Sequence, residues 1–527
     1  MTGQHRHDLA MVPLPYALSD AGHRRTLRGT TLRVAGPADL VGAIAALADR
    51  CRGLAVAAAD PAAADVVVDI HPQWRGGIDG DPARGLDPGG ADDAPPDGFS
   101  ITVVDRRLRV RAAGSRGAFH ALTAVVQAVS GPMGGTAELP LIEAEELPGM
   151  LRWRGLSLDV ARRFCPLDEL RTIVDLMAYY RLNVLHLHLT DAVAWRLRMP
   201  GRPRLTPDPD ACYDAAQLAE LARYAALRHV AIVPEIDMPG HILAAVTAYP
   251  ELGGDKPPPH PGLTHLRPDV PAATAFAQEA VHLLCGLSPS PYVHIGGDEA
   301  FGMDPGEYAR FVRAAHEWVR TRGKRPVAWQ EASRGRVFGT GDVLQLWISP
   351  QDAPRAEELD RRLPAQYAFL RDTLLDTFRS APQDLPRAVA DGAHLLLSPS
   401  FPFYLDRRYG EPSTDPAQTA SMERLGHAGY PVAHTSDLYS WQPHDITAVA
   451  DGTARIAGAE AVLWTETTGD ADDLAALLLP RLPLLAEMMW STRRSPWSAA
   501  AARIAAHAPV WQRLGLSGYY RSAEVFG

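Results

Sequence analysis

The sequence predicts an α/β protein in which a (β/α)₈ barrel follows a smaller α+β domain. The 527-residue chain is longer than one ordinary core requires, which favours two domains of unequal size. Beyond residue 155, short apolar runs alternate with helical patterns, as expected for a barrel of parallel strands. Acidic residues directly follow several of these runs, at the strand ends where (β/α)₈ proteins gather their functional side chains.

The first 147 residues are expected to form the α+β domain, and residues 148–527 the barrel. β-rich runs and helical patterns are mixed in the first part rather than alternating regularly. The β-rich runs lie at residues 65–70 and 99–110. The helical patterns lie at residues 38–51 and 115–129.

Eight apolar runs are the candidate barrel strands. They lie at residues 156–160, 183–189, 230–236, 292–295, 326–329, 343–347, 394–397 and 461–464. Strands buried on both faces are expected to be apolar without a break, which matches these runs. The acidic residues that follow a run are Asp191, Asp237, Asp298, Glu299 and Glu466. We therefore expect one functional face at the carboxyl ends of the strands.

Residues 351–390 separate the sixth and seventh runs by a long, charged and helical stretch that we interpret as an insertion. A charged helix of this kind is usually a solvated surface, but its position next to the barrel mouth also allows it to shape the entrance. Apolar residues at helical spacing over 472–489 are expected to close the barrel. One more helix is expected over 495–514.

Composition excludes several classes of protein. Hydrophobic residues make up 46% and charged residues 22% of the chain, as in ordinary globular proteins. A net charge of -10 argues against a nucleic-acid partner. No signal peptide and no membrane-length apolar stretch are visible, so a cytoplasmic location without membrane contact is expected, and secretion stays open if the true N-terminus differs. The oligomeric state cannot be read from the sequence.

The four cysteines are scattered without CxxC spacing. They are Cys51, Cys165, Cys212 and Cys285. Neither a zinc site nor a disulfide framework is indicated by this spacing.

The most informative motif is the end of the fourth run, where Gly296 and Gly297 precede Asp298 and Glu299. Successive side chains of a strand point to opposite faces, so two adjacent acids can serve one site only if the strand has ended. The two glycines supply that ending. The plainer alternative is that Asp298 caps the following helix and Glu299 is a solvated acid.

Further motifs resolve this choice. The chain has RGLSLDVAR at 154–162, LHLHLTD at 185–191 and PEIDMPGH at 234–241, in order before HIGGDEA at 294–300. Together these resemble glycoside hydrolase family 20, the β-N-acetylhexosaminidases, from about residue 148 to 493. A weaker likeness covers the N-terminal region.

The resemblance implies an exo-acting, retaining enzyme that removes terminal N-acetylglucosamine or N-acetylgalactosamine from oligosaccharides. In such enzymes the 2-acetamido oxygen of the substrate attacks the anomeric carbon to form an oxazolinium ion, so no enzyme nucleophile, metal or cofactor is required. Glu299 is then the proton donor, and Asp298 accepts the acetamido N–H. Tyr404 donates to the acetamido carbonyl, while Asp191 and His241 form a relay behind Glu299.

The resemblance also implies a set of sugar-binding residues. Arg162 is expected to donate to the 3- and 4-hydroxyls, and Asp406 and Glu466 to accept the 4- and 6-hydroxyls. The tryptophans expected to wall the pocket are Trp329, Trp347, Trp441 and Trp464. Each of these tryptophans could equally belong to the core.

One departure from the family pattern concerns Ala192, Val193 and Ala194, which stand where family members commonly have a second acidic residue and a glutamine. Asp191 is retained. The support of the second barrel loop and the preference for the leaving group are therefore open.

Three alternatives remain at the level of sequence. In an ordinary retaining glycosidase Glu466 would be the nucleophile. His186 and His188 lie on one face of a strand and could bind zinc in a metal-dependent amidohydrolase. A carbohydrate-binding protein without catalytic activity is the third alternative, although binding alone does not require a proton donor.

Overall fold

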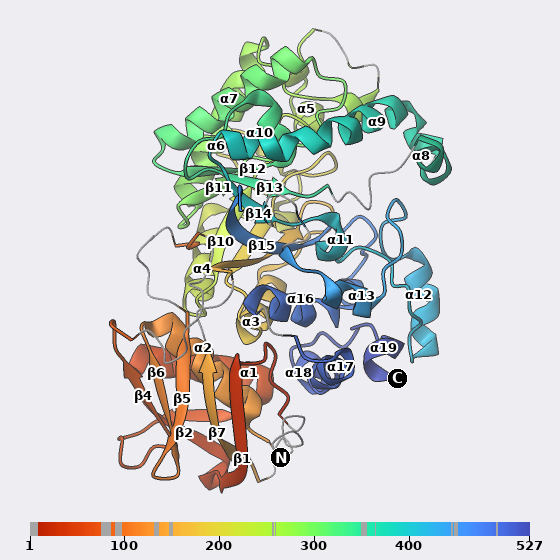
Figure 1. Ribbon diagram of the computed structural model, residues 1–527. Coiled ribbons are helices and arrows are strands. Elements are labelled where there is room, and N and C mark those ends of the chain that lie inside the picture. Colours follow the sequence, from red (N-terminus) through yellow and green to blue (C-terminus); the bar gives the residue numbers. More distant parts are fainter. Residues whose placement is uncertain are drawn as a thin grey trace.

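The computed structural model describes residues 9–527 except 75–85, 90–96, 131–135, 147–150, 256–257, 259, 349–355, 364, 444–445, 447–448, 450–451 and 492–493. It contains an N-terminal α+β lobe and a barrel, which lie one below the other in Figure 1. The expected boundary at residue 147 lies outside the described residues.

The N-terminal lobe is built on a seven-stranded sheet, counted over the described residues, in the order β1-β7-β5-β6-β4-β2-β3. Its strands are β1 (Ala17–Thr26), β2 (Thr31–Ala35), β3 (Ala55–Ala58), β4 (Val66–Ile70), β5 (Phe99–Val104), β6 (Arg107–Ala112) and β7 (Glu138–Glu146). The β-rich run at 99–110 is thus two strands. Asp105 and Arg106 join them with φ of 51° and 58°, the left-handed pair that a tight hairpin turn requires.

Two helices of the lobe, α1 (Ala38–Arg52) and α2 (Ser115–Ala128), confirm the predicted helical patterns. Helix α1 also packs against α3 and α18 of the barrel domain. The lobe and the barrel domain are therefore joined by helix–helix packing (Figure 1).

The second part is a closed barrel of eight parallel strands among the described residues, in the order β10-β11-β12-β13-β14-β15-β8-β9. The strands are β8 (Trp153–Asp159), β9 (Val184–His188), β10 (Ala231–Glu235), β11 (Tyr292–His294), β12 (Arg325–Trp329), β13 (Val343–Leu346), β14 (His394–Leu397) and β15 (Arg455–Leu463). Each of the eight predicted runs overlaps one of them, which confirms the barrel. Only β8 and β15 begin clearly earlier than predicted.

The second part of the chain also contains helices around and beside the barrel (Figure 1). They are α3 (Leu167–Tyr179), α4 (Ala215–Ala226), α5 (Leu243–Ala248), α6 (Pro271–Leu287), α7 (Pro305–Thr321), α8 (Ala356–Arg362), α9 (Arg371–Ser380), α10 (Asp384–Ala390), α11 (Ser400–Phe403), α12 (Thr419–Arg424), α13 (Thr435–Ser440), α15 (Ala471–Leu478), α16 (Arg481–Trp490), α17 (Trp497–Ala505), α18 (Ala508–Arg513) and α19 (Ala523–Phe526). None of the described helices has the length and apolar character needed to cross a membrane.

Two of the predicted long helices are broken in the structure. The pattern at 472–489 forms α15 and α16, which are separated at Leu479 and Pro480 because proline lacks the N–H that would continue the helix. The pattern at 495–514 likewise forms α17 and α18. The charged stretch at 351–390 is helical over α8, α9 and α10, and its residues 351–355 and 364 lie outside the described part.

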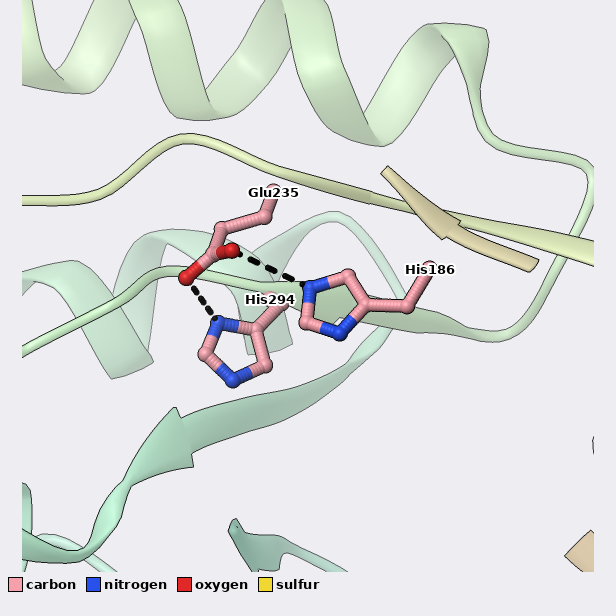
Figure 2. A group of neighbouring side chains, drawn as sticks. All are labelled: His186, Glu235 and His294. Atoms are coloured by element: carbon pink, nitrogen blue, oxygen red, sulfur yellow. Dashed lines mark ion pairs between the residues drawn. The ribbon is translucent and has the colours of Figure 1, made fainter. Parts of the chain in front are cut away.

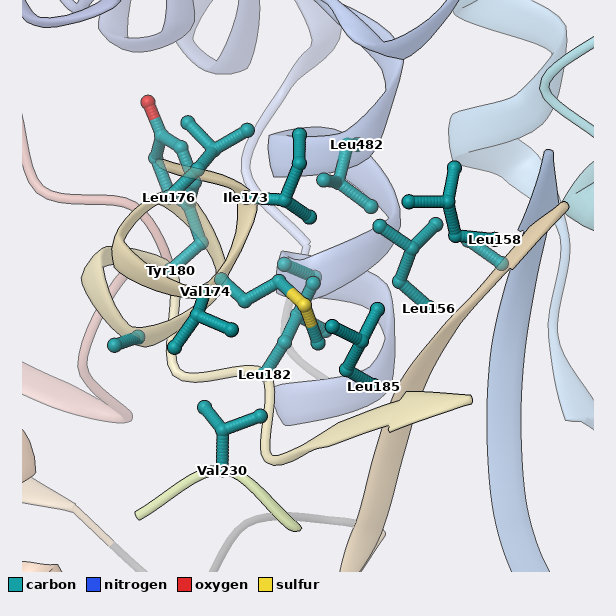
Figure 3. Packing of buried hydrophobic residues seen from close by; sticks show 14 of the residues in the cluster. Leu156, Leu158, Ile173, Val174, Leu176, Tyr180, Leu182, Leu185, Val230 and Leu482 are labelled. Carbon is teal, nitrogen blue, oxygen red and sulfur yellow. The ribbon is translucent and has the colours of Figure 1, made fainter. Parts of the chain in front are cut away.

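The core between strands and helices is apolar and closely packed. Figure 3 shows Leu156 and Leu158 of β8 and Leu185 of β9 packed against Ile173 of α3 and Leu482 of α16. Burying a leucine side chain of this kind contributes about 1.5–3 kcal/mol. These contacts fix β8 and β9, which carry several residues of the functional face.

The N-terminal lobe contacts the end of the barrel at which the strands begin. Leu86 joins a ring of buried barrel residues that includes Trp153 and Tyr292, and its backbone N–H donates to the carbonyl of Ala457 at 2.9 Å. Arg154, at the start of β8, is fully buried, and its Nη2 lies 2.8 Å from Asp97 Oδ2 of the lobe. The lobe therefore supplies both an apolar contact and a carboxylate to the barrel.

Candidate active site

A cavity of about 150 Å³ opens at the carboxyl ends of the barrel strands. It is lined by Arg162, His188, Asp191, Asp237, His241, Asp298, Glu299, Trp347, Tyr404, Asp406, His427, Tyr430, Trp464 and Glu466. Ten of the twelve predicted site residues are in this set, and the two that are not are Trp329 and Trp441. The loops after the strands thus bring residues from distant parts of the chain into one cavity.

The turn after β11 places both acids in the cavity. Gly296 and Gly297 have φ of 67° and 105°, which ends the strand at the predicted position. The Gly297 N–H donates to Asp237 Oδ1 at 3.0 Å, and the Tyr308 hydroxyl donates to the Gly297 carbonyl. A Cβ at position 296 would lie 1.7 Å from Asp237 Oδ1. Only glycine fits there, because both the backbone conformation and the space exclude a side chain.

Gly296→Ala is expected to destabilise the protein by roughly 2 kcal/mol or more, because strain and a steric clash act at the same residue. The measurement is the midpoint of thermal unfolding. Gly286→Ala in α6 is the control, since a Cβ there meets no atom within 4 Å. Equal midpoints for the two variants would contradict the geometry of this turn.

A carboxylate–imidazole pair lies behind Glu299. His241 Nδ1 lies 3.1 Å from Asp191 Oδ2, and His241 Nε2 lies 3.5 Å from Glu299 Oε2. Burial by itself would lower the pKa of His241, but the carboxylates of Asp191 and Asp237 raise it well above 6.5. This arrangement can hold Glu299 and exchange a proton with it.

Asp298 lies beside a second buried acid, Asp237. Burial and the charge of Asp237 raise the pKa of Asp298 well above its usual range, and burial raises the pKa of Asp237 to about 6. Two neighbouring carboxyls of this kind share a proton rather than ionising together. Asp298 Oδ1 is buried and accepts no hydrogen bond from the described residues, whereas buried polar atoms normally have a partner.

Arg162 organises the opposite side of the cavity. Its guanidinium lies 3.2 Å from Asp159, 2.7 Å from Asp191 and 3.4 Å from Glu466, and 5.2 Å above the ring of Trp464. These contacts hold the guanidinium in one orientation and leave it at the edge of the cavity.

Asp406 lies on the same side of the cavity. Both of its carboxyl oxygens are buried and have no hydrogen-bond partner among the described residues. Burial and the charge of Glu466 raise the pKa of Asp406 well above 3.8. Asp406 is thus a free acceptor pair that fits a ligand with several O–H groups.

The predicted tryptophans separate into two groups. Trp347 and Trp464 line the cavity. Trp329 is 1% exposed and its Nε1 donates to Glu235 at 2.9 Å, because the last residue of β12 points into the barrel interior. Trp441 packs edge-on against Phe403 at 4.9 Å. Among the described residues, these two indoles support the wall from behind rather than lining it.

Four lining residues were not predicted as site residues. His188 and Asp237 lie in recognised motifs, and their side chains face the cavity through the alternation of β9 and the turn after β10. His427 and Tyr430 lie in a loop. The backbone N–H of His427 donates to the backbone carbonyl of Asp406 at 2.7 Å. The rings of Tyr430 and Tyr404 lie edge-to-face, with their centroids 5.7 Å apart. A loop without periodicity gave no signal for these last two.

The segment that departs from the family pattern forms a short closed turn. The Asp191 N–H donates to the Ala194 carbonyl at 2.8 Å, and Thr190 pairs with Trp195. Asp191 therefore keeps its position without the missing acid and glutamine. Val193 is 68% exposed at the tip of this turn.

A buried polar layer lies below the cavity. Figure 2 shows Glu235 between His186 and His294, at 3.2 Å and 2.9 Å. All three residues are buried, and their side-chain atoms lie within 4.8 Å of one another. The geometry by itself suits shared protons or a shared cation, so the choice between a glycosidase and a metal-dependent amidohydrolase depends on the family.

Comparison with known proteins decides the family. Residues 151–493 match the model of the catalytic domain of glycosyl hydrolase family 20. The chain is 35% identical to the β-N-acetylhexosaminidase of Cellulomonas fimi over 443 residues, covering 81% of each chain.

Solved structures agree with this result. A β-N-acetylglucosaminidase of the same family superposes with a TM-score of 0.74 at 28% identity, covering 98% of this chain and 99% of the other. A mutant β-hexosaminidase of Streptomyces plicatus, solved with its product GlcNAc, superposes with a TM-score of 0.76 at 27% identity, covering 98% and 97%. The amidohydrolase alternative is therefore wrong. The chain belongs to glycosyl hydrolase family 20, and it is a glycoside hydrolase of the β-hexosaminidase type.

Proposed function

We propose that the enzyme removes terminal, non-reducing N-acetylglucosamine and N-acetylgalactosamine from oligosaccharides with retention of configuration. The reaction proceeds by substrate-assisted catalysis through an oxazolinium ion. This mechanism requires a substrate with a 2-acetamido group. The observation that carries the proposal is Asp298 Oδ1, a buried acceptor in the cavity without a hydrogen-bond partner among the described residues.

An acetamido group matches this acceptor and its surroundings. Its N–H supplies the missing donor for Asp298 Oδ1. Tyr404 lines the same cavity, and burial raises the pKa of its phenol well above 10, so the hydroxyl keeps its proton and donates to the acetamido carbonyl. Trp464 and Trp347 give apolar walls that exclude water from the cationic intermediate. The acetamido oxygen is thus oriented toward the anomeric carbon.

The chemical steps follow from these positions. Glu299 gives its proton to the glycosidic oxygen, the bond from that oxygen to the anomeric carbon breaks, and the acetamido carbonyl oxygen bonds to the same carbon. A water molecule then attacks the anomeric carbon, passes its proton to Glu299 and restores the acetamido group. His241 and Asp191 support the acid in both steps. Two inversions at one carbon give net retention.

The other side of the cavity favours a terminal sugar. The free oxygens of Asp406 accept hydroxyl protons, and the guanidinium of Arg162 donates to hydroxyl oxygens. Glu466, beside Arg162, accepts from a third hydroxyl. Binding of the 3-, 4- and 6-hydroxyls as free groups requires that no further sugar is linked there, which makes the enzyme exo-acting.

Turnover of chromogenic N-acetyl-β-glucosaminides and N-acetyl-β-galactosaminides tests the proposal. We expect both to be hydrolysed, and proton NMR at early times is expected to show the β-anomer as the first product. If the α-anomer appears first, the retaining mechanism is refuted. If neither substrate turns over while N-acetylglucosamine binds, the proposed substrate range is refuted.

A further inference from the structure

The relay behind the catalytic acid continues into the barrel interior through His188. His188 Nε2 lies 3.3 Å from Asp191 Oδ2, the same oxygen that His241 Nδ1 contacts at 3.1 Å. On its other side, His188 Nδ1 lies 2.6 Å from Glu235 Oε2. A continuous series of carboxylates and imidazoles therefore runs from Glu299 through His241, Asp191 and His188 to Glu235.

Glu235 is held as an anion at the inner end of this series. It has no solvent exposure, yet both of its oxygens are occupied by donors. Besides His188, it faces His186 at 3.2 Å and His294 at 2.9 Å (Figure 2), and Trp329 Nε1 donates to it at 2.9 Å. Burial alone would raise the pKa of Glu235, but these imidazoles lower it well below 4.5.

Both ring nitrogens of His188 face carboxylate oxygens, which places a proton on each and makes the ring a cation. Burial alone would lower the pKa of His188, but Glu235 and Asp191 raise it well above 6.5. The other ionisable groups that act on His188 come from the neighbouring strands and loops. They are Asp159 on β8 and Asp237 after β10, while His241, after β10, and Arg162, after β8, contact the same Asp191 oxygen as His188. The residue directly after β15, Trp464, contributes an uncharged ring whose centroid lies 5.1 Å from that of His188.

We propose that His188, kept as a cation by Glu235, is a positioning residue that sets where the proton lies in the Glu299–His241 pair. This inference rests on the proposed function, in which Glu299 is the acid. The cations of His188 and Arg162 together offset the charge of Asp191, which receives three donors on one oxygen. Asp191 is then less able to draw a second proton onto His241. The proton on His241 Nε2, which lies 3.5 Å from Glu299 Oε2, is therefore held less tightly and passes more readily to Glu299.

Removing the charge of His188 is expected to shift the proton of the Glu299–His241 pair toward His241. Asp191 would then hold the imidazolium form of His241 more strongly, and the Nε2–H of His241 would donate to the Glu299 carboxylate and stabilise its ionised form. The acid would lose its proton at a lower pH. The basic limb of the pH–activity profile is therefore expected to shift to lower pH, and substrates with poor leaving groups are expected to suffer most, because they need the proton.

The test uses His188→Gln and Glu235→Gln in the full chain, with aryl N-acetyl-β-glucosaminides that differ in leaving-group acidity. We expect the basic limb to move down by about half a pH unit or more. We expect kcat/KM to fall about 10-fold or more for the methoxyphenyl substrate, and about 3-fold or less for the dinitrophenyl substrate. An equal loss on both substrates with an unmoved limb would mean that His188 has only a structural role, and the proposal would be overturned.

His186→Gln is the matched control. His186 lies two residues earlier on β9, is equally buried and contacts the same Glu235 carboxylate, but its other nitrogen faces Glu460 at 3.1 Å instead of Asp191. Any loss in this variant is expected to be equal for all leaving groups, with the basic limb unchanged. A shift as large as that of His188→Gln would overturn the specific role of His188.

A measurement on the unmodified enzyme does not depend on how the variants fold. Neutron diffraction of deuterium-exchanged crystals at the pH of maximal activity is expected to show deuterium on both nitrogens of His188, and a bare nitrogen would overturn the proposal. The proposed function fails separately: if Glu299→Gln leaves the dependence on leaving group unchanged, Glu299 is not the acid, whatever the state of His188.

Discussion

Glu299→Gln is expected to lower kcat/KM for the methoxyphenyl N-acetyl-β-glucosaminide by about 10²–10⁴-fold, the contribution of a well-placed general acid. Glutamine keeps the size of the side chain and can still contact His241, but it has no proton to give at neutral pH. The dinitrophenyl substrate, whose leaving group departs without a proton, is expected to keep most of its rate. The measurement is kcat/KM for both substrates across pH, in which the basic limb disappears for the variant.

Glu307→Gln is the control for this variant. Glu307 lies in the first turn of α7, outside the lining of the cavity among the described residues, and pairs with Arg267 at 3.2 Å. Its loss is expected to leave both rates close to those of the unmodified enzyme. If Glu299→Gln slows the two aryl substrates equally, Glu299 acts other than by proton transfer.

Asp298→Asn is expected to lower kcat for N-acetyl-β-glucosaminides by about 10²–10³-fold, the usual effect of removing one preorganised electrostatic partner. The asparagine amide cannot carry the negative charge that Asp298 shares with Asp237 and that stabilises the oxazolinium ion, and it can turn an N–H toward the acetamido N–H. The unmodified enzyme is expected to hydrolyse the plain β-glucoside more slowly by roughly 10³-fold or more, because a well-oriented internal nucleophile is worth roughly 7–11 kcal/mol. Asp298→Asn is expected to reduce this difference.

Asp304→Asn separates this effect from a general loss of structure. Asp304 caps α7 by accepting the N–H groups of Gly306 and Glu307, and it lies outside the lining of the cavity within the described residues. Its variant is expected to keep the preference for the N-acetyl sugar. Equal rates of the unmodified enzyme on both sugars would refute substrate assistance and make Glu466 the nucleophile.

The sequence predicted the barrel well because its strands are buried on both faces and are therefore apolar without a break. The starts of β8 and β15 were not predicted, because the prediction relied on an unbroken apolar pattern. Arg154 and Glu460 interrupt the apolar pattern, yet both are buried, since Arg154 pairs with Asp97 and Glu460 accepts from Trp153 Nε1 at 2.7 Å. A charged residue in a strand indicates burial only when its partner is known, and the partner lies far away in the chain.

The site was predictable where motifs end at strands and unpredictable where it depends on orientation. The glycines before Asp298 fixed the place of the acids. By contrast, the last residue of a strand can point inward or toward the rim, so the inward direction of Trp329 and its contact with Glu235 required the structure. His427 and Tyr430 reach the cavity from a loop whose path no periodic pattern records.

The contact between Leu86, Asp97 and the base of the barrel limits how the enzyme can be shortened. A protein cut down to the catalytic part would leave the guanidinium of Arg154 without its carboxylate in an apolar setting, which costs far more than the loss of a surface pair. It would also uncover the ring of large side chains around Trp153. The barrel therefore depends on the amino-terminal lobe for its stability, and truncation is expected to produce an aggregating protein rather than a minimal catalyst.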